Sequence, residues 1–311
     1  MRNTAWACDQ IVIGVPSFRR PRLLRRTLED VQRECAEQSA VVVVADNEGP
    51  DGEATAAVRS LSACGSALAV EVTPVPDIGL ARVRNALLRE AFTVRRAEWL
   101  VMVDDDMCLG RGWLDAALRV AGHYQAEVVA GAVYPEFEVP PPVWADGLTE
   151  YWRGVRPEGL TPPCFGMGAI LLHANVMALA PEGLDSRFDA TGGEDTEFLR
   201  RLHARGARMA YAPEAVSFEW YGRERITRKW VLRRAFRTGA IDARIALTTG
   251  QRLLQFGRCV GRIGWRSLVG SWLFVSGLTS APRRMRGVRE LVRQAGRVSG
   301  LLGRVPEGYG R

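Results

Sequence analysis

The apolar segment from Trp99 to Val103 is followed at once by three consecutive aspartates, Asp104, Asp105 and Asp106. Three like charges cannot lie inside a dry sheet without a cation or water to compensate them, so the strand predicted here has to end at Val103. The carboxyl ends of strands in an open α/β sheet are where ligands bind. The triplet therefore predicts a sheet with an acidic, ligand-binding edge.

Within the triplet, Asp104 and Asp106 project to one side of an extended chain and Asp105 projects to the other. Two carboxylates at this spacing can hold one hard divalent cation and leave its other positions to water and substrate phosphates. A solvated acidic turn is the alternative, because aspartate after a strand also begins loops. The triplet alone leaves both interpretations open.

Apolar segments and helical patterns alternate through the first half of the chain. We expect strands over residues 11–15, 41–45, 70–74, 99–103 and 128–133, and helices over residues 23–38, 80–92 and 112–125. Short, continuously apolar strands separated by helices are typical of an α/β fold with a mainly parallel sheet covered on both faces.

The second half is less regular. Residues 135–163 are rich in proline and predict a long loop, and residues 166–172 are apolar again. A short helix is expected over residues 195–204, with Gly206 well placed as its C-terminal cap. A basic helix is expected over residues 226–247. We therefore expect a catalytic domain over residues 1–247 and a basic helical extension over residues 248–311.

The net charge of +7 is unevenly distributed along the chain. Between Gln251 and Arg304 there are eleven arginines and one acid, Glu290, which gives +10; the last seven residues balance, so residues 1–250 carry 7 − 10 = −3. A basic tail suits nucleic acid, anionic lipid or a phosphorylated substrate.

Several function classes lack their motifs. Lys229 is the only lysine and no P-loop glycine pattern precedes it, and the three histidines show no metal spacing. The sequence also lacks G-x-G-x-x-G, H-E-x-x-H and G-x-S-x-G, which argues against dinucleotide oxidoreductases, zinc hydrolases and α/β-hydrolases. Six scattered cysteines without a CxxC favour reduced thiols, and no export signal is evident at the N-terminus, so we expect a cytoplasmic protein.

Other polar residues also follow apolar segments. Asp46 and Asn47 close the second predicted strand, where a carboxylate can accept hydrogen bonds from a base or ribose or begin a turn. Arg84 and Asn85 lie early in the next helix, where arginines meet a diphosphate or form a solvated face. Asp195 follows two glycines and a glutamate, and acids in a first helical turn also simply complement the helix dipole.

In order along the chain, the segments VPSFRRP, VVVVADN, GLARVRN, VMVDDDM and TGGEDTEFLRR resemble those of family 2 glycosyltransferases of GT-A fold. With RITRKWVLRRAFRTG added, the chain is most similar to bacterial exopolysaccharide glucosyltransferases of the succinoglycan type. The resemblance spans roughly residues 10–245. Each segment is a weak signal, whereas five in order at this spacing are a specific one.

The resemblance implies an inverting enzyme that moves a sugar from a nucleoside diphosphate sugar, most typically a UDP-sugar, with Mg²⁺ or Mn²⁺. Asp195 matches the catalytic base. The implied nucleotide-binding residues are Asp46, Arg84, Asn85, Asp104 and Asp105. The implied metal ligands are Asp104, Asp106 and Glu219, the last standing where many relatives carry histidine. Gly168 also departs from the family, in which asparagine is usual.

The implied acceptor is a glycan or a polyprenyl-diphosphate-linked sugar in cell-surface polysaccharide synthesis, and no nucleic acid is expected. The alternatives are a metal-dependent nucleotidyl- or phosphotransferase, and a non-catalytic membrane or nucleic-acid adaptor that uses the basic tail.

The tail itself contains sixteen uncharged residues between Arg266 and Arg283, with Trp272 and Phe274 near their centre. This is short of the roughly 20 apolar residues of a spanning helix. It predicts either a helical hairpin packed on the catalytic domain or a peripheral element on the inner face of the plasma membrane, bound to anionic lipid.

Overall fold

The structure, a computed structural model, describes residues 11–34, 40–48, 52–63, 70–248 and 252–308. The chain forms two compact units. The first comprises Met1–Tyr134, Gly154–Asp189 and Glu194–Glu219, and the second comprises Pro135–Arg153, Ala190–Gly193 and Trp220–Arg311. The expected division into a catalytic domain over residues 1–247 and a helical extension over residues 248–311 stays a prediction.

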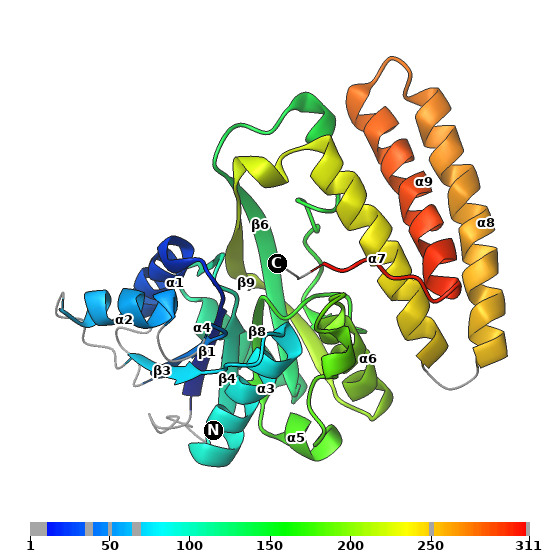
Figure 1. Cartoon of the computed structure of the whole chain (residues 1–311). Coiled ribbons are helices and arrows are strands. Elements are labelled where there is room, and N and C mark those ends of the chain that lie inside the picture. The colour runs from blue at the N-terminus through cyan, green and yellow to red at the C-terminus, as the bar shows by residue number, and fades with distance from the viewer. Residues whose placement is uncertain (1–10, 35–39, 49–51, 64–69, 249–251, 309–311) are drawn as a thin grey trace. The chain divides into compact units, whose positions relative to one another are not determined.

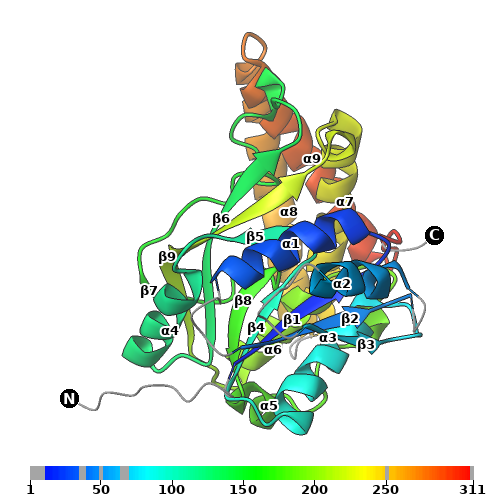
Figure 2. The same cartoon turned by 90° about the vertical axis from the view of Figure 1, so that its left-hand side faces the viewer.

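Four strands of the first unit form a parallel array in the order β3-β2-β1-β4. They are β1 (Ile11–Ser17), β2 (Val41–Asp46), β3 (Val70–Pro74) and β4 (Trp99–Val103). Figure 2 shows them side by side. Because they are parallel, their carboxyl ends share one edge, where Asp46 pairs in register with both Ser17 and Pro74.

The sheet continues beyond β4 with antiparallel strands, in the order β8-β6-β9-β5. These strands are β8 (Ala169–His173), β6 (Val128–Phe137), β9 (Met209–Tyr221) and β5 (Met107–Leu109), with the two-residue β7 (Gly159–Leu160) beside β9. The α/β class and the parallel half of the sheet are as expected, and the antiparallel half is the new feature.

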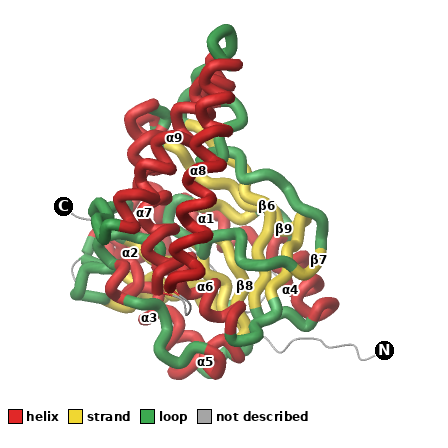
Figure 3. The backbone as a smooth tube through the Cα atoms, turned by 90° about the vertical axis from the view of Figure 1, so that its right-hand side faces the viewer, coloured by secondary structure: helices red, strands yellow, loops and turns green. Residues whose placement is uncertain are grey.

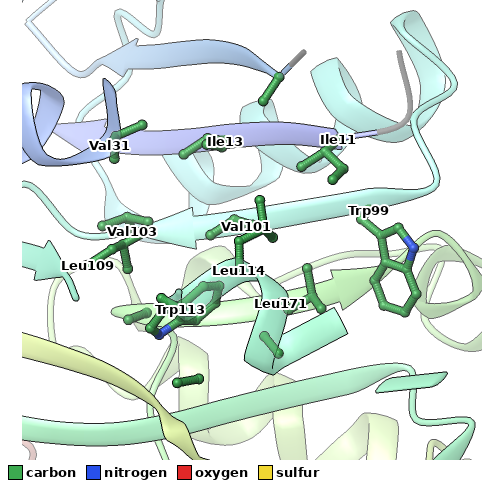
Figure 4. Packing of buried hydrophobic residues seen from close by; sticks show 14 of the residues in the cluster. Ile11, Ile13, Val31, Trp99, Val101, Val103, Leu109, Trp113, Leu114 and Leu171 are labelled. Carbon is green, nitrogen blue, oxygen red and sulfur yellow. The ribbon is translucent and has the colours of Figure 1, made fainter. Parts of the chain in front are cut away.

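Alternation along the buried strands directs apolar side chains to both faces of the sheet. Ile11 and Ile13 of β1 belong to one buried cluster with Val31 of α1 (Pro21–Glu34) and Trp113 of α4 (Trp113–Tyr124), which Figure 4 shows. This face is also covered by α2 (Glu53–Ala63).

On the opposite face, Val12 belongs to a cluster with Leu87 of α3 (Leu80–Arg89) and Phe198 of α6 (Glu194–Ala204). The short helix α5 (Asn175–Leu179) contributes Val176 to the same cluster. The sheet is thus sandwiched between two layers of helices.

The sequence-based boundaries hold within a few residues for most expected elements. The first expected helix ends at Glu34 in the described part, and residues 35–38 lie outside it. The helix expected over residues 80–92 continues beyond α3 as a π-helical turn, Glu90–Val94. Gly206 follows α6 with φ of 94°, as its capping role requires. Of the six cysteines, Cys8, Cys35 and Cys64 lie outside the described residues.

In the second unit, α9 (Ala281–Leu301) packs against both α7 (Arg228–Thr248) and α8 (Arg252–Ser276), and Figure 3 shows the three helices together. The loop predicted over residues 135–163 contributes buried Leu148 and Tyr151 to this unit's core. The Oη of Tyr151 donates to the carbonyl oxygen of Arg225 at 2.8 Å. The proline-rich segment is therefore anchored by its own aromatic residues.

The approach of β6 to β9 leaves no room for a side chain at Gly131, where a Cβ would collide with the carbonyl oxygen of Ala215. We expect Gly131→Ala to lower the free energy of unfolding by about 1–3 kcal/mol, the usual cost of overpacking. Gly122 is exposed in α4 and a Cβ there meets nothing within 4 Å, so Gly122→Ala should be neutral or stabilising. Urea unfolding of both variants tests this, and equal stabilities would contradict it.

Candidate active site

The aspartate triplet forms the tight turn between β4 and β5. The amide of Asp104 donates to the carbonyl oxygen of Gly168 at 2.8 Å, and the amide of Met107 donates to the carbonyl oxygen of Asp104 at 3.0 Å. The hydroxyl of buried Thr27 in α1 lies 2.9 Å from the carbonyl oxygen of Asp105. These bonds fix the turn at the carboxyl edge of the parallel strands, as the sequence predicted.

Arg84 is the centre of the charged cluster at this edge. Its guanidinium is 3 % exposed, and it donates to Oδ1 of Asp104 at 2.8 Å and to Oε1 of Glu194 at 2.7 Å. Burial works against the charge on Arg84, but Asp104, Glu194 and Asp195 more than offset it, so the pKa of Arg84 is raised. One arginine of α3 thereby joins the end of β4 to the first turn of α6.

Glu194 is almost fully buried beside this guanidinium. Burial raises the pKa of Glu194 above its ordinary value, whereas the charge of Arg84 opposes that shift. The carboxylate of Glu194 is therefore held in its ion pair with Arg84, and the adjacent Asp195 is the more solvent-accessible of the two acids.

Asp195 is partly exposed, and its Oδ1 accepts from the amide of Thr196 at 2.6 Å. Its Oδ2 faces Gly166, where a Cβ would lie 3.1 Å away. A Cβ at Gly168 would likewise lie 2.9 Å from Oδ2 of Asp104. The segment from Gly166 to Gly168 therefore runs close beside both carboxylates, and a larger side chain at either glycine would press against them. The departure from the family's asparagine at Gly168 falls within this segment.

Arg20 is a member of the site that the sequence reasoning missed. Its Nη1 donates to Oδ1 of Asp105 at 3.2 Å and to Oδ2 of Asp106 at 3.0 Å. Burial raises the pKa of Asp105 to about 7, and Arg20 opposes this shift. Its place in the sequence could have predicted this contact, because Arg20 follows the end of β1 by three residues and so lies at the same edge of the sheet as the triplet.

Glu219 lies on β9 next to the triplet. It pairs in register with Met107, the residue that directly follows Asp106, and it is 6 % exposed. The three predicted metal ligands thus lie in adjoining segments. In the described part of the chain, no group of three or more acidic, histidine or cysteine side chains could by itself hold a metal ion.

The residues predicted to meet the base and nucleotide have different surroundings. Asp46 is fully buried, its Oδ1 accepts from the amide of Glu48 at 3.0 Å, and burial raises its pKa. The side-chain amide of Asn85 forms two hydrogen bonds with the backbone of Leu184, at 2.9 Å and 2.8 Å. Asn85 therefore holds a loop, and its predicted contact with a nucleotide stays a prediction.

Two further polar residues brace the approach to α3. Asn47 donates to the carbonyl oxygens of Val75 and Asp77 and accepts from the amide of Gly79 at 3.0 Å. The carboxylate of Asp189 accepts from the amide of Ala81 at 2.8 Å and so caps α3 from 108 residues away. These contacts set the start of the helix that carries Arg84.

We expect Arg84→Met to lower the free energy of unfolding by about 3–5 kcal/mol, because it leaves Glu194 buried without its cation. The double variant Arg84→Met/Glu194→Met removes both charges and should recover most of that loss. Urea unfolding measures both. If the single variant were as stable as the parent chain, the ion pair would not have the structural role described.

Comparisons with known proteins agree with this arrangement. Residues 12–166 match the model of the family described as glycosyl transferase family 2. The chain is 28 % identical over 297 residues to the succinoglycan biosynthesis protein ExoM of Rhizobium meliloti (strain 1021), covering 94 % of this chain and 93 % of that protein.

Two solved structures show the same fold. The mannosyltransferase PcManGT from Pyrobaculum calidifontis, in complex with GDP-Man and Mn²⁺, has a TM-score of 0.65 at 16 % identity, covering 94 % of this chain and 87 % of its own. TarS of S. aureus, in complex with UDP-GlcNAc, has a TM-score of 0.52 at 12 % identity, with coverages of 95 % and 92 %. With the acids arranged at the carboxyl edge of a GT-A fold, the chain belongs to glycosyl transferase family 2.

Proposed function

We propose that this glycosyltransferase is an inverting, metal-dependent enzyme that moves a sugar from a nucleoside diphosphate sugar to a hydroxyl group of a glycan or lipid-linked acceptor. The observation that carries the proposal is the Arg84 cluster, which brings Asp104 and Asp195 to one edge of the sheet. The similarity to a succinoglycan biosynthesis protein supports a role in cell-surface polysaccharide synthesis. Membership of a glycosyltransferase family argues against a nucleotidyltransferase and against a non-catalytic adaptor.

The donor set fits a hard divalent cation. Asp104, Asp106 and Glu219 offer only oxygen ligands, which suit Mg²⁺ or Mn²⁺. Since no three such groups form a complete cage in the described residues, a cation would take one or two carboxylates and complete its shell with phosphates and water, as Mg²⁺ usually does. When bound, it would neutralise charge on the departing diphosphate.

Each side chain of the site has a proposed task. Asp46 contacts the base, which is uracil for a UDP-sugar, and Asp104 and Asp105 lie beside the ribose. Arg84 fixes Asp104 relative to α6, and its two ion pairs occupy the groups that would otherwise bind a phosphate. Arg20 holds Asp105 and Asp106 in place. A UDP-sugar is the proposed donor, although one solved neighbour holds GDP-Man and another UDP-GlcNAc.

Asp195 is the proposed general base. It is partly exposed, and it follows a glutamate whose carboxylate is already paired with Arg84. Removing the proton of the acceptor hydroxyl as that oxygen attacks the anomeric carbon makes the oxygen a better nucleophile. Attack from the face opposite the departing diphosphate inverts the anomeric centre.

Asp195→Asn keeps the shape of the side chain and cannot take up a proton. We expect sugar transfer to fall by about 10²-fold or more with donor affinity almost unchanged. Glu197→Gln, on the same helix, is the matched control, because Glu197 pairs with Arg201 at 2.9 Å and has no proposed part in the chemistry. Near-normal transfer by Asp195→Asn would remove it from the base role. Retained anomeric configuration, read from the product by NMR, would contradict direct displacement.

Asp106→Ala removes a proposed metal ligand. We expect it to abolish metal-dependent donor turnover and to weaken Mn²⁺-dependent binding of UDP, measured by calorimetry, while the fold persists. Asp77→Ala is the control, since that side chain is 74 % exposed and forms its ion pair with Arg82, at 2.8 Å. Unchanged Mn²⁺-dependent affinity in Asp106→Ala would contradict the metal assignment.

A further inference from the structure

Helix α8 exposes an apolar surface along one side. Trp265 and Leu268 are each 67 % exposed and Trp272 is 63 % exposed. These three residues belong to a continuous stripe of exposed residues that recur every three or four positions. The stripe, here called the α8 outer face, consists of Leu254, Gly257, Gly261, Trp265, Leu268, Trp272 and Val275. This spacing places side chains on one side of a helix. Exposed apolar surface of this extent on one element marks an interaction site.

The other side of α8 is already used by the fold. Cys259 and Gly270 are buried, and a Cβ at Gly270 would lie 3.1 Å from the side chain of Leu291 on α9. By contrast, a Cβ at Gly257 or Gly261 meets nothing within 4 Å. Packing within the helical unit therefore explains the inner side of α8 and leaves the outer face without a partner among the described residues of that unit.

Charge along the edge of this face identifies the partner. Arg258, Arg262 and Arg266 follow one another at four-residue intervals beside the stripe, and the helix contains no acidic residue. Arg266 pairs with Glu290 at 3.2 Å, whereas Arg258 and Arg262 form no ion pair with another described residue. A second copy of α8 contains no acid that could pair with these arginines, so a negatively charged surface is the complementary partner.

The size and composition of the helix set the mode of contact. No helix in the described part of the chain is long and apolar enough to cross a membrane. Tryptophan favours the boundary between lipid headgroups and acyl chains, and arginine beside an apolar stripe draws on anionic lipid. We infer that the α8 outer face lies in the plane of an anionic phospholipid membrane, with Trp265 and Trp272 inserted and Arg258 and Arg262 on the headgroups.

Membrane binding by this face would hold the enzyme at the membrane that carries a lipid-linked acceptor. That purpose rests on the proposed function, whereas the binding itself does not. Lipid binding is measured without turnover. Failure of the membrane inference is therefore distinguishable from failure of the proposed sugar transfer.

The test is co-sedimentation of the full chain with vesicles of phosphatidylcholine alone and of phosphatidylcholine mixed with phosphatidylglycerol. We expect binding to the anionic vesicles only. Arg258→Gln/Arg262→Gln should weaken it roughly 25-fold, at about fivefold for each arginine. Trp265→Ser/Trp272→Ser should weaken it by roughly tenfold or more. Val143→Ser/Leu160→Ser, which changes exposed apolar residues elsewhere, should bind as the parent chain does.

Circular dichroism of each variant establishes that it is folded. Equal binding of the parent chain to neutral and anionic vesicles would overturn the inference, as would no binding to either. A dimer seen by sedimentation velocity that Trp265→Ser/Trp272→Ser dissociates, without any lipid binding by the parent chain, would assign the face to a second copy instead.

Discussion

The buried guanidinium of Arg84 is the interaction on which the site depends. It contacts one carboxylate at the end of β4 and another at the start of α6, two segments separated by ninety residues along the chain. Removing three charged groups from water is costly, and the cost is offset only while all of them stay in contact. The same arrangement that restrains Arg84 and Glu194 therefore also fixes where the neighbouring Asp195 lies relative to the aspartate triplet.

This constraint spreads outward through α3. Asn47 braces the loop before that helix, and Asp189 caps its first turn. Arg20 likewise pairs with Asp105 and Asp106, whose negative charges would otherwise repel each other. The acids of the site are thus held by arginines from two different segments, and the chain from Gly166 to Gly168 lies close beside Asp104 and Asp195.

Much of the parallel half of the fold could be predicted because its signals are local. The apolar strands each span a few residues, and the cost of burying three aspartates requires Val103 to end β4. The partners of Arg84 and Arg20 could not be predicted, since they depend on how distant segments meet. Strand β9 was missed for another reason: its alternation buries Ser217 and Glu219 and exposes Phe218, so hydrophobicity points to the wrong face.

We propose that Asp46, the aspartate triplet and Asp195 form one site for a nucleoside diphosphate sugar with its cation. Diffraction at the manganese absorption edge, from crystals of the chain grown with UDP and Mn²⁺, would locate both groups in one experiment. We expect a single anomalous peak beside Asp106, with the diphosphate next to it and the base at Asp46. Nucleotide bound away from these acids, or Mn²⁺ bound elsewhere on the protein, would contradict it.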